Sequence, residues 1–144
     1  MKSIIETARE DSRLSISSRI ADAGDAAEFL PERGPYTMFI PGNVAYTKIP
    51  VEKVEAIAND RERLRDMIMY HVVQGKLTAR ELARMEAIRT LQGDHLDITS
   101  SPEGVLVNDA TIIYPDTECT DGIYHIIDRV LIPRAVDARV TRSV

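Results

Sequence analysis

The spacing of apolar residues changes near residue 87, and this change constrains the fold more than any other feature of the sequence. Before it, apolar residues recur at the three- and four-residue spacing of amphipathic helices. The clearest helix carries Leu64, Met67, Ile68 and His71 on one face. After residue 87, short β-branched runs alternate with turn-forming residues. Helices first and strands afterwards predict an α+β domain.

Capping residues predict where the short helices of the first half begin and end. Asp25 stands three residues before a glutamate, which is the spacing of a capping box, and residues 59–62 repeat it. Gly75 is expected to end the helix that begins there, with residues 72–73 in its last turn. Thr78 is expected to start a further, shorter helix. The first half should therefore be a set of short helices.

The second half is expected to form antiparallel strands, because the turns between its β-branched runs are too short to contain crossover helices. An earlier β-prone run at residues 36–40, set off by chain-breaking residues 31–35, is expected to join them. We expect one domain over residues 1–133 and a polar C-terminal tail over residues 134–144. The predicted strands of the second half are residues 88–91, 96–99, 105–107, 111–113 and 123–132.

Composition excludes several classes of function. The formal net charge is -5 at pH 7, whereas binding to nucleic acid needs concentrated Lys and Arg. No stretch approaches the roughly 20 apolar residues of a membrane span. The first residues, MKSIIE, lack the apolar run of an export signal. They predict a cytoplasmic protein if Met1 is the native start.

Chemical motifs for a cofactor, a metal or an enzyme are missing from the sequence. Cys119 is the single cysteine, so the chain contains no internal disulfide. His95 stands between Asp94 and Asp97, but no second His or Cys lies at the spacing of a zinc ligand. Neither a serine nucleophile elbow nor a glycine-rich phosphate loop is present. We therefore expect a protein without enzyme activity and without a cofactor.

Three segments resemble motifs of the fasciclin I domain family. Residues 36–46, YTMFIPGNVAY, are similar to the family's first signature, TVFAPTNEAF. Tyr70 and His71 match its Tyr-His motif. Residues 121–133, DGIYHIIDRVLIP, are similar to its second signature, NGVIHVIDKVLLP. With two further segments in the family's order, the resemblance covers about residues 3–133.

The resemblance implies both a fold and a role. The fold is a β-wedge or sandwich of mostly antiparallel strands flanked by short helices. The role is adhesion or binding to a protein, cell-surface or matrix ligand, usually outside the cell, and a stand-alone domain resembles the prokaryotic members. Some animal members bind integrins through the Tyr-His segment and an Asp-Ile pair. Here Asp116 is followed by Thr117, and no Arg-Gly-Asp occurs, which disfavours binding of the integrin type.

The resemblance and the local charge together select site residues of two kinds. Acidic residues gather in the segment before the second signature, which favours a basic or cation-bridged partner. The candidate partner-binding residues are Tyr70, His71, Asp116 and Glu118. The motif residues expected to have structural roles are Phe39, Pro41, Asn43, Gly122, His125, Asp128 and Pro133.

An alternative function, small-ligand binding or weak hydrolysis around the Tyr-His motif, depends on the histidines. His71 shares a helix face with apolar residues, which favours a core histidine with hydrogen-bonded ring nitrogens over a general base. Strand alternation places His125 and Asp128 on opposite faces, which disfavours a dyad. We therefore expect a protein-sized contact surface and no deep, chemically equipped cleft.

Overall fold

The computed structural model describes residues 1–30 and 34–133. Short helices dominate the first half and strands the second, which confirms the predicted α+β class. The segment 31–33 and the predicted tail over residues 134–144 lie outside the described residues. In chain order the elements are α1 Ile4–Arg9, η1 Ser12–Leu14, α2 Ser15–Ala23, α3 Ala26–Phe29, β1 Tyr36–Pro41, η2 Asn43–Lys48, α4 Val51–Ala58, α5 Arg61–Met69, β2 Val72–Gln74, α6 Ala79–Leu82, β3 Ala87–Arg89, β4 His95–Ser101, β5 Gly104–Val107, β6 Ala110–Cys119 and β7 Gly122–Ile127.

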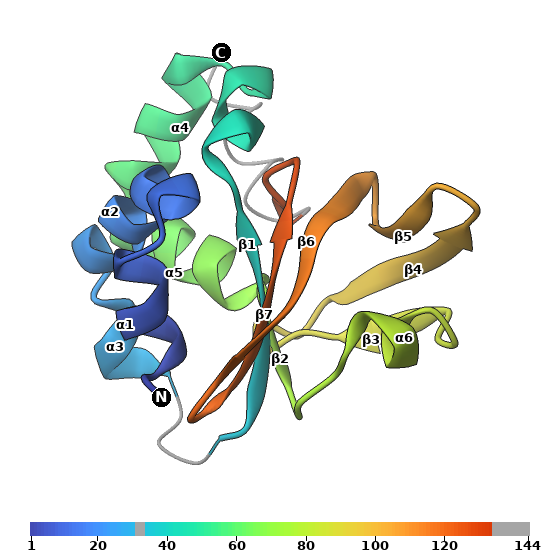
Figure 1. Cartoon of the computed structure of the whole chain (residues 1–144). Coiled ribbons are helices and arrows are strands. Elements are labelled where there is room, and N and C mark those ends of the chain that lie inside the picture. Colours follow the sequence, from blue (N-terminus) through green and yellow to red (C-terminus); the bar gives the residue numbers. More distant parts are fainter. Residues whose placement is uncertain (31–33, 134–144) are drawn as a thin grey trace.

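The strands form one sheet in the order β2-β1-β7-β6-β5-β4-β3. Pairing is antiparallel except between β1 and β7, which run parallel. The Leu91 N–H after β3 donates to the Val72 carbonyl of β2 at 2.8 Å, so the two ends of the strand order approach each other. Figure 1 shows the resulting wedge: α1, α2 and α5 lie on one side of β1 and β7, and β3 to β5 with α6 on the other.

The central strands β1 and β7 are buried on both faces, which is why they read as continuous apolar runs. On the helical side, Met38 and Ile40 pack with Tyr124 and Ile126. On the opposite side, Phe39 and Ile127 pack with Tyr70, Leu82, Leu96 and Val107. Ile57, Leu64, Met67 and Ile68 form a third cluster between α4 and α5. The sheet thus divides the core into two parts, and the part on the helical side contains two separate clusters.

Three local predictions for the helices need correction. Residues 72–73 leave the helix after Met69 and form β2, because β1 offers them an antiparallel partner. Asp25 is not a side-chain cap: its backbone is left-handed, and its carboxylate pairs with Arg61. The cap of α5 is Asp60 rather than Asn59, with Asp60 accepting from the Arg63 N–H at 3.2 Å. The predicted helix start at Thr78 is confirmed, and its side chain forms a capping box with Glu81.

Two strand predictions had wrong ends. β7 stops at Ile127, so the segment after it, with buried Leu131 and Pro133, is not part of the sheet. β6 is much longer than residues 111–113 and continues through Pro115 to Cys119. It does so because the ladder with β7 shifts register between Ile112 and Thr117. Such bulges accept a proline, whose missing N–H is not required there.

Candidate binding surface

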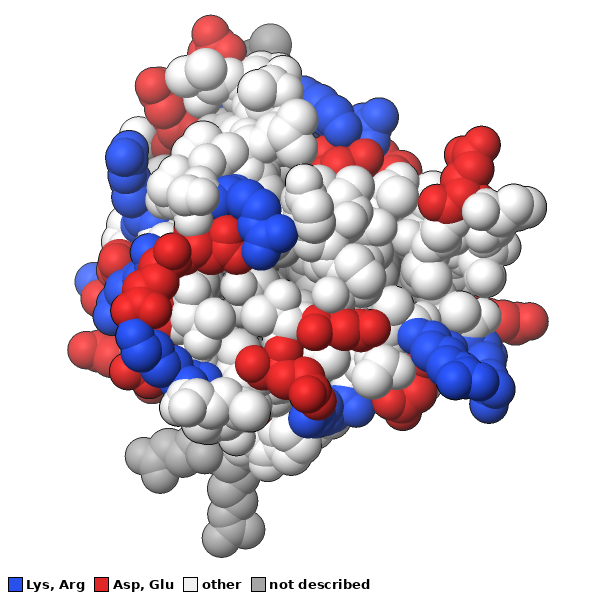
Figure 2. All heavy atoms as spheres, in the orientation of Figure 1, with Lys and Arg blue, Asp and Glu red and all other residues white. Residues whose placement is uncertain are grey.

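The charges on the visible face are mixed in sign. Figure 2 shows Lys and Arg side chains beside Asp and Glu side chains, with uncharged areas between them. Lys76 pairs with Glu118 at 2.7 Å, and Arg9 pairs with Asp22 at the same distance. Exposed ion pairs of this kind contribute about 0–1 kcal/mol each and produce no long-range field of one sign. Lys76 therefore neutralises part of the negative charge of the segment that contains Glu118.

The middle of β6 is the exposed part of an otherwise paired strand. Its side chains at Ile113 and Tyr114 are 37% and 47% exposed, although large apolar residues are mostly buried in the described core. The Arg13 guanidinium lies 4.4 Å from the centre of the Tyr114 ring and covers one side of it. We call Ile113, Tyr114, Pro115, Asp116 and Glu118 the β6 bulge surface.

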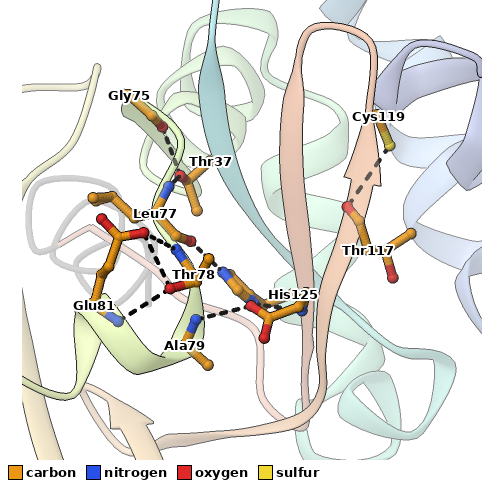
Figure 3. Close-up of polar contacts among 10 residues, drawn as sticks. Thr37, Gly75, Leu77, Thr78, Ala79, Glu81, Thr117, Cys119 and His125 are labelled. Atoms are coloured by element: carbon orange, nitrogen blue, oxygen red, sulfur yellow. Dashed lines mark hydrogen bonds and ion pairs between the residues drawn. The ribbon is translucent and has the colours of Figure 1, made fainter.

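The buried side chain of His125 holds the backbone of this bulge in place. Its Nε2–H donates to the Leu77 carbonyl at 2.8 Å, and its Nδ1 accepts the Asp116 N–H at 3.0 Å. The Asp116 carboxylate then accepts the Ala79 N–H at 2.9 Å, which joins β6 to the start of α6 (Figure 3). Burial lowers the pKa of His125, so its ring is neutral in this arrangement. Asp116, at a φ of 62°, is held in a left-handed conformation by these contacts.

Thr37 completes the same network from β1. Its hydroxyl donates to the Gly75 carbonyl at 2.6 Å and accepts the Leu77 N–H at 2.8 Å (Figure 3). The Phe39 ring stacks on His125 with 5.8 Å between ring centres. Thr37 and Phe39, both in the first signature, therefore hold the Leu77 segment and His125, which position the bulge.

Tyr70 and His71 lie inside the protein. Both residues are 6% exposed, so their side chains are not available on the surface. The Tyr70 hydroxyl donates to the His95 carbonyl at 3.0 Å and accepts from the Asn108 amide at 3.2 Å. The His71 Nδ1–H donates to the Met67 carbonyl at 2.7 Å, and its Nε2 accepts the Leu131 N–H at 3.0 Å. His71 is thus the satisfied core histidine that its helix face predicted.

The remaining motif residues have backbone partners. Asp128 accepts the Thr111 N–H at 2.7 Å and pairs with Lys48 at 3.4 Å. Asn43 accepts the Ile16 N–H at 3.0 Å, and Pro41 pairs with Ile127 in the parallel ladder. Asp128 and His71 therefore bond to different backbone groups and do not form a catalytic pair with each other.

Gly122 opens β7 at a φ of 154°, and a Cβ there would lie 1.9 Å from the Tyr36 carbonyl oxygen. A side chain would therefore overlap the backbone of β1. Its neighbour Asp121 is also structural, because its carboxylate accepts the Ile4 N–H at 2.8 Å. The second signature thus fixes where β7 begins and how it meets both β1 and α1.

Sequence reasoning missed the apolar half of the β6 bulge surface. The predicted strands ended at residue 113 and resumed at residue 123, so nothing indicated that Tyr114 would stand on an exposed strand. It also missed that Lys76 lies beside Glu118, because the two are far apart in the sequence. A Tyr-Pro pair inside a strand pattern is the local signal that could have suggested a bulge.

A cavity contradicts part of the expectation about clefts. An apolar space between α1, α2, α5 and β1 reaches His71, which forms part of its wall. The hydroxyl groups of Ser17, Ser18 and Tyr46 and both ring nitrogens of His71 in its wall are hydrogen-bonded within the protein. Within the described ranges, no group of three or more His, Cys, Asp or Glu side chains is placed to hold a metal ion. None of the described helices is both long and apolar enough to cross a bilayer.

Comparisons with known proteins identify the family. The profile of the fasciclin domain family matches residues 12–133. An uncharacterized protein of Synechocystis sp. is 33% identical over 132 residues, which are 92% of this chain and 98% of that protein. The cell surface glycolipoprotein MPB83 of Mycobacterium bovis is 28% identical over 102 residues, covering 71% of this chain and 46% of that protein.

A solved structure shows the same fold. It is a FAS1 domain pair from the insect cell adhesion molecule fasciclin I, with a TM-score of 0.77 at 19% identity. The match covers 94% of this chain and 52% of the insect chain, so this chain spans about half of that structure. The family profile, which matches most of the chain, and the Synechocystis relative show that the chain belongs to the fasciclin domain family.

Proposed function

We propose that this chain is a non-catalytic binding module of the adhesion type, formed by residues 1–133, and that its contact surface is the β6 bulge surface. The observation that carries the proposal is the exposure of Ile113 and Tyr114 on a strand that is otherwise paired and anchored. The family supports the role, since its mycobacterial relative is a cell surface glycolipoprotein. The insect protein that shares the fold is a cell adhesion molecule.

The surface suits a protein partner because it is rigid and chemically mixed. Tyrosine is enriched among the residues that dominate protein interfaces, since it supplies contact area and a hydroxyl with little loss of side-chain entropy. The bulge is already fixed through His125 and Asp116, so binding does not have to order it. A stable interface buries about 800 Å² on each partner, so the bulge would be its centre and Lys76 part of its rim.

The charged side chains of the β6 bulge surface indicate which kind of partner it favours. The side chains of Glu118 and Asp116 are 58% and 45% exposed, and the rim lysine, Lys76, neutralises only one of them. A partner with a basic group beside an apolar patch fits this arrangement. Because exposed charges are screened beyond a Debye length of about 8 Å at physiological ionic strength, salt should weaken binding without abolishing it.

The test is attachment of cells of the source organism to a surface coated with this protein. Tyr114→Ser should remove most of the attachment, and Glu118→Ser should reduce it mainly at low salt. Val51→Ser is the matched control, because Val51 is 65% exposed but lies on α4, outside the bulge. Attachment that ignores Tyr114→Ser would reject the surface. Hydrolase activity that is lost on His71→Ala would reject the whole non-catalytic class.

A further inference from the structure

The apolar cavity in the helical layer lies where two core clusters meet. Ile4 and Met38 line it from the cluster between α1 and the sheet, and Met67 and Ile68 line it from the cluster around α5. Its volume is about 70 Å³. A single water molecule needs roughly 10–15 Å³ on the same measure, so the cavity has room for one small organic molecule.

Short side chains on the first two helices account for this space. Ala8 of α1 and Ser17, Ser18 and Ala21 of α2 all line the cavity. Larger residues at these positions would fill the seam between the clusters, as close packing elsewhere in protein cores does. The cavity therefore follows from the sequence of α1 and α2.

Hydrogen bonds inside the protein satisfy the hydroxyl groups of the wall. Ser17 donates to the Pro41 carbonyl at 2.6 Å and accepts from the Tyr46 hydroxyl at 2.8 Å. Ser18 donates to the Ala8 carbonyl at 3.2 Å. Burial raises the pKa of Tyr46 to about 12, so its phenol carries no charge at neutral pH.

The ionisable groups of the wall are likewise occupied. His71 uses both ring nitrogens for backbone groups, and burial lowers its pKa to about 4, which keeps the ring neutral. Arg9 of α1 pairs with Asp22 of α2 at 2.7 Å, so these two charges compensate each other. A polar ligand would have to break one of these contacts, whereas an apolar ligand would leave all of them intact.

The mouth of the cavity lies at the edge of α1 and α2. Ile5, Ile20 and Ala21 line the cavity and are half-buried, whereas Ile4 and Phe39 at its base are fully buried. Arg9 and Asp22 are exposed wall residues beside them. A small molecule can therefore enter from solvent past aliphatic side chains without opening the sheet.

We propose that this cavity binds one small neutral apolar molecule, of the size of a single aromatic ring or a short hydrocarbon chain. The apolar wall would hold it by burial of its surface, and satisfied polar groups give no reason to prefer a charged ligand. The site is separate from the β6 bulge surface, so it is independent of the proposed adhesion function.

Titration with toluene and with benzoate tests the proposal. The two probes have similar rings, but only benzoate is charged. Toluene should produce saturable NMR shifts at the methyl groups of Ile5, Met38 and Met67, and should raise the melting temperature as a ligand of the folded state does. Benzoate should produce much smaller effects. Absence of toluene shifts, or a preference for benzoate, would overturn the proposal.

Cavity-filling variants show whether toluene occupies this space. Ala21→Leu should weaken toluene binding at least about tenfold while keeping the melting temperature, because it fills a void rather than creating one. Ala23→Leu is the matched control on the exposed face of the same helix and should keep wild-type affinity. Ile5→Phe repeats the test from α1. Equal affinity of wild-type protein and both filled variants would place the ligand elsewhere and refute the site.

Discussion

The segment around Tyr70 and His71 and the β6 bulge surface both carry polar side chains beside apolar ones, but the fold uses them differently. His71 is 6% exposed and bonds to two backbone groups, whereas the Glu118 side chain is 58% exposed and bonds to Lys76. The first region holds helix, strand and C-terminal segment together. The second is free to vary chemically because His125 and Asp116 hold its backbone. A change in the first region should therefore cost stability, and a change in the second should cost binding.

The largest expected effect belongs to β7, the strand that pairs with both β1 and β6. Gly122→Ala should prevent folding, because its Cβ would lie 1.9 Å from the Tyr36 carbonyl oxygen. Gly104→Ala is the matched control: its φ of 132° is also unfavourable for a side chain, but no atom lies within 4 Å. It should cost only the conformational strain, about 1–2 kcal/mol. Circular dichroism and urea unfolding measure both; a folded, stable Gly122→Ala variant would contradict the close β1–β7 contact.

The next effect tests the interior region directly. His71→Ala should lower the free energy of unfolding by about 2–4 kcal/mol, because it leaves the Leu131 N–H and the Met67 carbonyl unpaired and opens a cavity. His95→Ala, at an exposed histidine, should change it by less than about 0.5 kcal/mol. Thermal unfolding of the two variants is the measurement. Equal midpoints for both would show that His71 is no part of the core.

Acid should weaken the interior region, because burial lowers the pKa of His71. Burial lowers the pKa of His71 from 6.5 to about 4, so between these pH values the unfolded chain binds more protons than the folded one. Stability therefore falls as the pH drops through this window, by roughly 2 kcal/mol between about pH 7 and about pH 5. The pKa of His125 is also lowered by burial, which adds in the same direction.

Urea unfolding at the two pH values checks this prediction. The lowered pKa of Asp11, about 2, affects stability only at more acidic pH and does not interfere. His71→Ala should show a smaller loss between the two pH values than the wild-type protein, and His95→Ala should show the full loss. A loss that is unchanged in His71→Ala would assign the pH dependence to other groups.

The smallest expected effect on stability belongs to the surface. Glu118→Ser breaks the exposed pair with Lys76 and should leave the free energy of unfolding unchanged within the error of the measurement, because exposed pairs contribute little. The same variant should weaken attachment at low salt. Calorimetry beside the attachment assay separates the two quantities. A large loss of stability would mean that the bulge is part of the structural core and would remove the contrast between the regions.

Much of the fold and part of the site could be predicted from local sequence. The helix start at Thr78 and the β-prone run at residues 36–40 are short-range patterns, and the structure contains both. The burial of His71 followed from its helix face. These predictions succeeded because each depends on neighbours within a few residues, whose spacing the sequence displays directly.

Other features depend on contacts between distant segments. β2 exists because β1 is its neighbour, and the cavity exists because small residues on α1 and α2 face the seam between two clusters. The exposed Tyr114 side chain lies where the register between β6 and β7 shifts. No local pattern shows which strand lies beside which, or how their registers match.

The sequence by itself thus determined the class of the fold, the family motifs and the residues that are buried by periodicity. The tertiary structure alone decided which backbone groups His71 joins and that Tyr114 reaches the surface. The physical reason is that secondary structure follows from short-range hydrogen bonding and side-chain spacing, whereas a binding surface is defined by what long-range packing leaves uncovered.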